Sequence, residues 1–107
     1  MRRFHYFNEC LTGVFGVSDY CFSCVVEAES EEQAFEWGQR VAKEYNDRFG
    51  LLPRGRKLGD EELIENGGVT EWDVADDEHL HKHLFCRVGE LPDLVAWENS
   101  RPKFPWS

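Results

Sequence analysis

Three histidines alternate along the C-terminal third of the chain, and a cysteine follows them. If the segment is extended, His79, His81 and His83 share one face, and Cys86 lies three residues further on. Zinc binds imidazole nitrogen and thiolate sulfur in tetrahedral sites, and the preceding acidic run 76–78 could add a ligand or orient the imidazoles. If the segment is helical, only His79 and His83 are neighbours. One hypothesis is therefore a zinc-binding domain or metal-dependent hydrolase; the alternative is a row of solvated polar side chains.

A second pair of cysteines has the spacing of a redox or zinc motif. Cys21 and Cys24 lie in an alternating segment, where residues three apart point to opposite faces of a sheet. A redox pair normally has its first cysteine at a helix N-terminus, which stabilises the thiolate, whereas the helix here begins only after Ser30. We therefore interpret both as ordinary thiols.

Acidic residues alternate with large aromatic residues in the C-terminal half. Protein interfaces that capture a basic partner combine aromatic anchors with complementary charge. The candidate partner-binding residues are Glu71, Trp72, Asp73, Asp76, Asp77, Glu78, Trp97 and Trp106. The alternative is that Trp72 and Trp97 belong to the core and that the carboxylates form a solvated rim.

The charge balance narrows the classes of partner. The chain has 21 acidic and 12 basic residues and a net charge of −9. This disfavours nucleic acids and anionic membranes, whose binding requires lysine and arginine, and it favours encounter with a basic protein. No apolar run is long enough to cross a bilayer, and the N-terminus lacks a signal-peptide core. We therefore expect a cytoplasmic protein with reduced thiols.

Apart from the histidine cluster, we recognise no pattern typical of an active site. There is no recognisable serine–histidine–acid arrangement, and the basic turn 54–57 lacks the glycine loop of a phosphate site. We therefore expect no cofactor and a non-enzymatic interaction module, such as an inhibitor or immunity protein that neutralises a basic partner. Zinc binding is the alternative. A third hypothesis is a structural subunit that self-associates through its sheet edge; the sequence leaves the oligomeric state open.

One long amphipathic helix, 30–49, organises the expected fold. Ser30 and Gln33 form a capping-box pattern, in which each side chain bonds the other residue's N–H. Gly50 is placed to end the helix in a left-handed conformation, before Pro53. The apolar side of the helix carries Ala34, Phe35, Trp37, Gly38, Val41, Ala42, Tyr45 and Phe49.

Alternating segments on both sides of this helix predict strands. Residues 1–28 are expected to form a β-hairpin, and its second strand turns Tyr20, Phe22, Cys24, Val26 and Ala28 toward the helix. Residues 60–65 are expected to form one or two helical turns, ended by a break at 66–68. Two further strands are expected within 69–88, at 69–74 and 84–88.

These elements predict a single α+β domain over residues 1–107. We expect an antiparallel sheet of about four strands, in ββαββ order, packed on the long helix. A short helix with Pro92 in its first turn and an aromatic, proline-rich tail are expected within 91–107.

Overall fold

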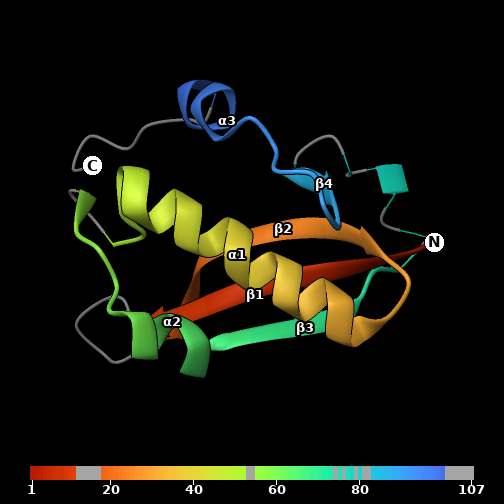
Figure 1. Cartoon of the computed structure of the whole chain (residues 1–107), viewed down its shortest axis with the longest axis horizontal. Coiled ribbons are helices and arrows are strands. Elements are labelled where there is room, and N and C mark those ends of the chain that lie inside the picture. The colour runs from red at the N-terminus through yellow and green to blue at the C-terminus, as the bar shows by residue number, and fades with distance from the viewer. Residues whose placement is uncertain are drawn as a thin grey trace.

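A mixed sheet with helices beside it forms the protein, which is therefore α+β (Figure 1). The computed structural model describes residues 1–11, 18–52, 55–73, 75, 77–78, 80 and 83–100. In chain order the elements are β1 (Arg2–Leu11), β2 (Ser18–Ala28), α1 (Glu31–Phe49), α2 (Asp60–Glu65), β3 (Gly67–Glu71), β4 (Phe85–Arg87) and α3 (Leu94–Ser100).

The strands are ordered β3-β1-β2-β4 in one sheet. β1 pairs antiparallel with β2 and β3, but β2 and β4 run parallel. The expectation of a purely antiparallel sheet is therefore wrong. β3 and β4 are the two edge strands of the sheet, so the chain must pass from one edge to the other between them. A connection of this length allows β4 to run parallel to β2. Alternation in a sequence sets the face of each side chain and leaves strand direction open.

Local capping fixes the start and end of α1. The Ser30 side chain accepts a hydrogen bond from the Gln33 N–H at 3.2 Å. The Gln33 side chain accepts from the N–H of Glu29 at 3.2 Å, one residue earlier than the capping box predicts. At the other end Gly50 has φ of 75° and ψ of 141°, and its N–H donates to the Asn46 carbonyl. Its positive φ is the reason that glycine suits this position.

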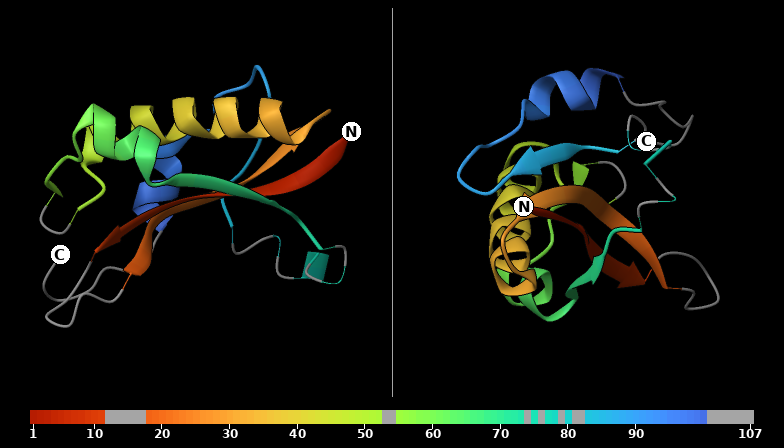
Figure 2. Two further views of the ribbon diagram at one scale, coloured as in Figure 1. Left: turned by 90° about the horizontal axis from the view of Figure 1, so that it is seen from below. Right: turned by 90° about the vertical axis from the view of Figure 1, so that its right-hand side faces the viewer.

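α1 lies along one face of the sheet, as Figure 2 shows, and the main core lies between the two. Alternate residues of the strands face α1, so each strand contributes every second side chain. The sheet supplies Phe4, Tyr6, Phe22, Cys24, Val26 and Ala28, and α1 supplies Ala34, Val41, Ala42 and Tyr45. On the other face of the sheet, Trp72 and His83 from the segment between β3 and β4 contact His5 of β1.

β3 begins earlier than the sequence indicated. Gly67 and Gly68, expected as a break, are its first two residues. A Cβ atom on Gly68 would lie 2.6 Å from Phe7 Cζ, and one on Gly67 would lie 2.1 Å from Gln39 Nε2. The glycines therefore let β3 approach side chains of β1 and α1 that any larger residue would displace.

α3 is held against α1 and the core. The Asp93 carboxylate accepts from the Ala96 N–H at 2.9 Å, so Pro92 precedes the helix instead of lying in its first turn. Leu94 is buried, and the Tyr45 hydroxyl donates to the Glu98 carboxylate. The tail 101–107 lies outside the described residues. Among the helices that are described, none combines the length and the apolar character that a bilayer crossing requires.

Candidate protein-binding surface

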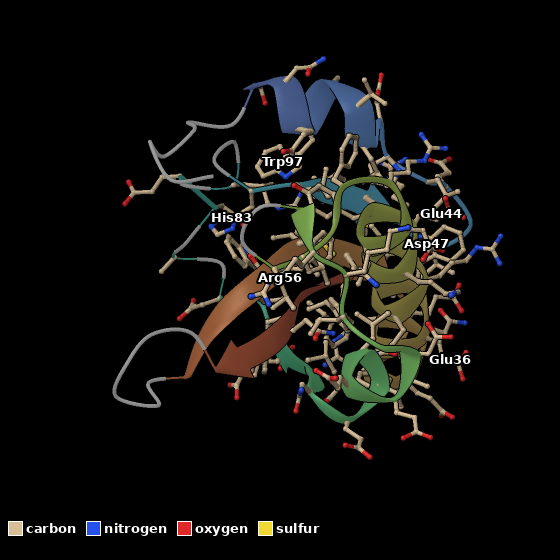
Figure 3. The ribbon with its side chains drawn as sticks, turned by 90° about the vertical axis from the view of Figure 1, so that its left-hand side faces the viewer. Glu36, Glu44, Asp47, Arg56, His83 and Trp97 are labelled. Atoms are coloured by element: carbon tan, nitrogen blue, oxygen red, sulfur yellow. The ribbon has the colours of Figure 1, made fainter. Side chains whose placement is uncertain are left out.

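The aromatic residues predicted to bind a partner are separated by the sheet. Trp97 is half-buried and packs on the main core beneath α3, as Figure 3 shows. Trp72 contacts His5 and His83 on the face away from α1. Asp76 and Trp106 lie outside the described residues. Of the predicted binding residues, Trp72 and Trp97 therefore lie on opposite sides of the sheet.

Trp72 instead anchors the segment between β3 and β4 on the far face. Its ring centroid lies 5.2 Å from that of His83 and 6.1 Å from that of His5, both edge-on. Its indole N–H donates to Asp77 Oδ1 at 2.8 Å. A half-buried indole with a satisfied N–H is typical of a structural contact. We call His5, Phe7, Trp72, Asp77 and His83 the far-face cluster.

The acidic residues near Trp72 are partly neutralised within the chain. Arg3 Nη1 donates to Asp77 Oδ1 at 3.2 Å, and Arg2 Nη2 donates to Glu71 Oε1 at 3.0 Å. Asp73 Oδ1 accepts from the Ala75 N–H at 2.9 Å, while Glu78 is exposed. Arginines from β1 therefore reduce the negative potential at this end of β3.

The residues predicted to bind zinc are also divided. Cys86 is buried in the main core, where its hydrogen bond with Cys24 and burial raise the pKa of the Cys24 thiol. His83 belongs to the far-face cluster, on the opposite side of the sheet. His79 and His81 lie outside the described residues. Within the part of the chain that the structure describes, no three histidine, cysteine or acidic side chains converge as metal ligands.

The far-face cluster predicts a pH dependence of stability. Burial and the nearby His83 lower the pKa of His5 below its usual value of about 6.5. As the pH is lowered, the His5 imidazole therefore binds a proton at a higher pH in the unfolded chain than in the folded protein. Stability should fall as the pH drops below about 6.5, and this loss is complete below the folded pKa. In urea titrations at several pH values, His5→Phe should show a shallower decline; equal slopes would contradict the prediction.

A further acidic surface lies on α2, a segment for which the sequence predicts only a short helix. We define the acidic α2 surface as the exposed residues Asp60, Glu61, Glu62, Ile64 and Glu65. Leu63 is the one buried residue that α2 contributes, and Ile64 is 61% exposed. Five of the six residues of α2 therefore face solvent, and four of them are carboxylates.

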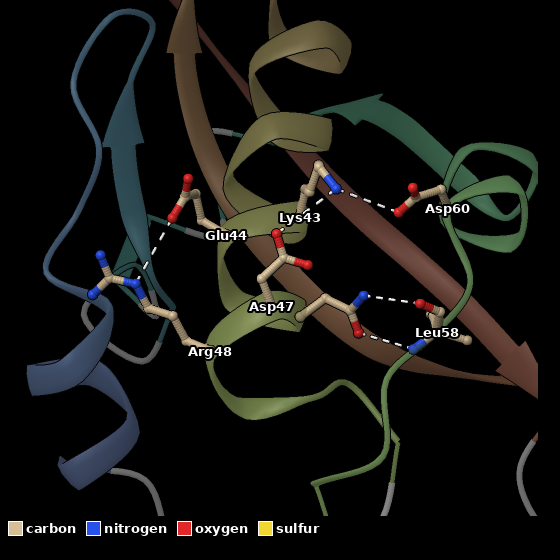
Figure 4. Close-up of polar contacts among 7 residues, drawn as sticks. Lys43, Glu44, Asp47, Arg48, Leu58 and Asp60 are labelled. Atoms are coloured by element: carbon tan, nitrogen blue, oxygen red, sulfur yellow. Dashed lines mark hydrogen bonds and ion pairs between the residues drawn. The ribbon is translucent and has the colours of Figure 1, made fainter.

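Little positive charge lies against this surface. Lys43 Nζ contacts Asp60 Oδ1 at 3.3 Å and also Asp47 Oδ2 at 3.7 Å (Figure 4). Among the described residues, no basic side chain forms an ion pair with Glu61, Glu62 or Glu65. Residues 60–65 contain four acidic residues, two aliphatic residues and no basic residue. This composition is the signal in the sequence that could have identified the surface.

A buried polar network fixes the position of α2. The Leu63 carbonyl accepts from Asn8 Nδ2 at 2.9 Å and from Gln39 Nε2 at 3.1 Å. Both amides also donate to the Tyr6 hydroxyl, at 2.9 Å and 2.8 Å respectively. Asn8 and Tyr6 are fully buried. Because buried polar groups are costly to leave unpaired, this network attaches α2 firmly to β1 and α1.

The acidic α2 surface continues into the edge of the sheet. Only Asn66 separates α2 from β3, and β3 is an edge strand that pairs with β1. Helix and strand run end to end along this border of the molecule (Figure 1).

No family model, curated protein or solved structure matches this chain.

Proposed function

We propose that this protein is a non-enzymatic interaction module that binds a basic protein through the acidic α2 surface. The observation that carries the proposal is the exposure of four carboxylates on one short helix, of which Asp60 alone is paired with a described cation, Lys43. Complementary charge accelerates encounter and disfavours partners of the wrong sign. An inhibitor or immunity protein that occupies a basic cleft is the class of function that fits best.

An apolar residue and a fixed backbone support the same proposal. Ile64 is 61% exposed in the middle of the carboxylates, where it can serve as an apolar anchor within a charged rim. The network through Asn8 and Gln39 holds α2 in place before any partner arrives. A preorganised helix loses little conformational entropy on binding, and affinity benefits accordingly.

Removing charge from α2 should weaken capture of the partner. We expect Glu61→Gln with Glu65→Gln to reduce the affinity for the partner about tenfold or more, because two complementary charges are lost. The wild-type protein is used to capture a partner from its own cells at near-physiological salt. The captured protein is identified by mass spectrometry, and its affinity for the variant is measured by calorimetry.

Glu29→Gln with Glu90→Gln is the matched control. It removes the same number of charges from exposed positions that follow β2 and β4. The control should bind nearly as tightly as the wild type. Recovery of no partner or of acidic proteins alone would contradict the proposed function, and so would equal losses in the two double variants.

Zinc binding is the alternative function, and one contact favours it. His5 and His83 come from distant parts of the sequence, yet their ring centroids lie 5.8 Å apart. His79 and His81 complete the set of histidines in this chain. Native mass spectrometry of protein purified without chelator tests this alternative. One zinc per chain that is lost when His79, His81 and His83 are replaced by alanine would support it; a metal-free chain would reject it.

A further inference from the structure

The outer edge of β3 carries backbone groups directed away from the sheet. The Trp72 N–H donates to the Arg3 carbonyl at 3.0 Å, and the Glu9 N–H donates to the Asn66 carbonyl at 2.9 Å. In an antiparallel pair the hydrogen-bonded positions alternate, so Gly68 and Thr70 also bond toward β1. The N–H and C=O groups of the intervening residues, Gly67, Val69 and Glu71, therefore point outward. In the described part of the chain, no strand pairs with this side of β3.

This edge has few of the features that normally protect an edge strand. Natural edges are blocked by lysine, proline, bulges or a covering element. β3 reads Gly-Gly-Val-Thr-Glu and contains neither lysine nor proline. Its two glycines are required by the close approach of Phe7 and Gln39, so the first part of the edge is bare backbone. Because Gly67 and Gly68 have no side chains, nothing on these two residues hinders an extended segment from reaching their backbone groups.

Negative charge is concentrated at the start of the edge. Asp60, Glu61, Glu62 and Glu65 precede β3, whereas at its end Glu71 and Asp77 are paired with Arg2 and Arg3. We propose, building on the proposed function, that an extended basic segment of the partner adds to β3 as a fifth strand. The backbone supplies the hydrogen bonds, and the carboxylates that precede β3 select lysine or arginine in the partner.

A second copy of this chain is a poor occupant of the same edge. Pairing two β3 edges would bring together two chains that each carry a net charge of −9. Like charges brought together at an interface disfavour the pairing. The edge therefore favours a basic partner over self-association. Amide protection of the free protein, measured at several protein concentrations, tests this point.

Amide hydrogen exchange provides a direct test with a defined probe. The probe is a short peptide of alternating lysine and valine, added to the intact protein. With the peptide bound, the amides of Gly67, Val69 and Glu71 should exchange at least about tenfold more slowly than in the free protein, because they gain hydrogen bonds. The amides of Gly68 and Thr70, already bonded to β1, should change little. Two control peptides are a glutamate–valine version and a lysine–valine version with alternating D- and L-residues; neither should protect these amides.

A proline variant removes one outward donor. Val69→Pro deletes the outward N–H while leaving the hydrogen bonds to β1, and proline is tolerated at such edge positions. Val69→Ala keeps the N–H and removes much of the side chain, so it is the matched control. The peptide should bind Val69→Pro about tenfold more weakly than Val69→Ala. If Val69→Pro fails to fold, the exchange pattern of the wild type decides the matter by itself.

Four outcomes would overturn the strand-addition proposal. The first is peptide binding without the alternating protection, and the second is equal binding by the proline and alanine variants. The third is protection of these amides in the free protein that increases with its concentration, which would show self-association. A partner whose capture depends on α2 but leaves the β3 amides unprotected would reject strand addition and leave the proposed function intact.

Discussion

Replacing Asn46 with alanine is expected to lower the free energy of unfolding by about 3 kcal/mol, a large part of the stability of a small domain. Asn46 is only 2% exposed. Its Oδ1 accepts from the N–H groups of Leu58 at 2.9 Å and Leu51 at 3.3 Å, and its Nδ2 donates to the Leu58 carbonyl at 3.0 Å. The bonds to Leu58 are drawn in Figure 4. Alanine would leave three buried backbone groups without these partners. Urea denaturation monitored by circular dichroism measures the loss.

The neighbouring residue provides the control for this prediction. Asp47 is exposed and makes a surface ion pair with Lys43, so Asp47→Ala should change the free energy of unfolding little. The loss in Asn46→Ala should therefore be much the larger of the two. Similar small effects would show that the chain between α1 and α2 is not held by Asn46.

Replacing Gly38 with alanine is expected to destabilise the protein by roughly 2 kcal/mol, because the added methyl group overpacks the core. A Cβ atom at this position would lie 2.3 Å from Tyr6 Cγ and 2.4 Å from Tyr6 Cδ2. Tyr6 is fully buried, and its hydroxyl belongs to the network that holds α2. The ring therefore has little freedom to move. In an unhindered helix, the same substitution would instead stabilise by about 1 kcal/mol.

Gly59→Ala is the matched control for Gly38→Ala. At Gly59 the backbone φ is −70°, and a Cβ atom would lie 3.6 Å from Glu62 Oε1, an ordinary contact. Alanine there should change stability little. The Gly38 variant is also expected to weaken partner capture if movement of Tyr6 displaces α2. Thermal unfolding of both variants, followed by the capture assay, separates these effects. Stabilisation by Gly38→Ala would show that the core adapts to the methyl group.

Local sequence patterns predicted the parts of the fold that depend on neighbours in the chain. Alternation placed Phe22, Cys24 and Val26 toward α1, and they are buried there. The Ser30 side chain caps α1 because it lies three residues before Gln33, whose N–H donates a hydrogen bond to it. Net charge and the acidic run 60–65 are also properties of the sequence itself. These features require no knowledge of distant contacts, which is why the α+β class could be predicted.

Long-range contacts decided the rest. Nothing local distinguishes Asn46 or Asn8 from solvent-exposed amides, because their partners, Leu58 and Leu63, are brought to them only by folding. Gly67 and Gly68 resemble a turn until β3 is packed against Phe7 and Gln39. The parallel direction of β4 and the meeting of His5 with His83 depend on how the chain passes from one edge of the sheet to the other. The sequence by itself thus determined which faces are apolar and where charge accumulates. The tertiary structure decided which strand of the described sheet lies at an edge and which described carboxylates form ion pairs, because pairing and neutralisation join residues far apart in the chain.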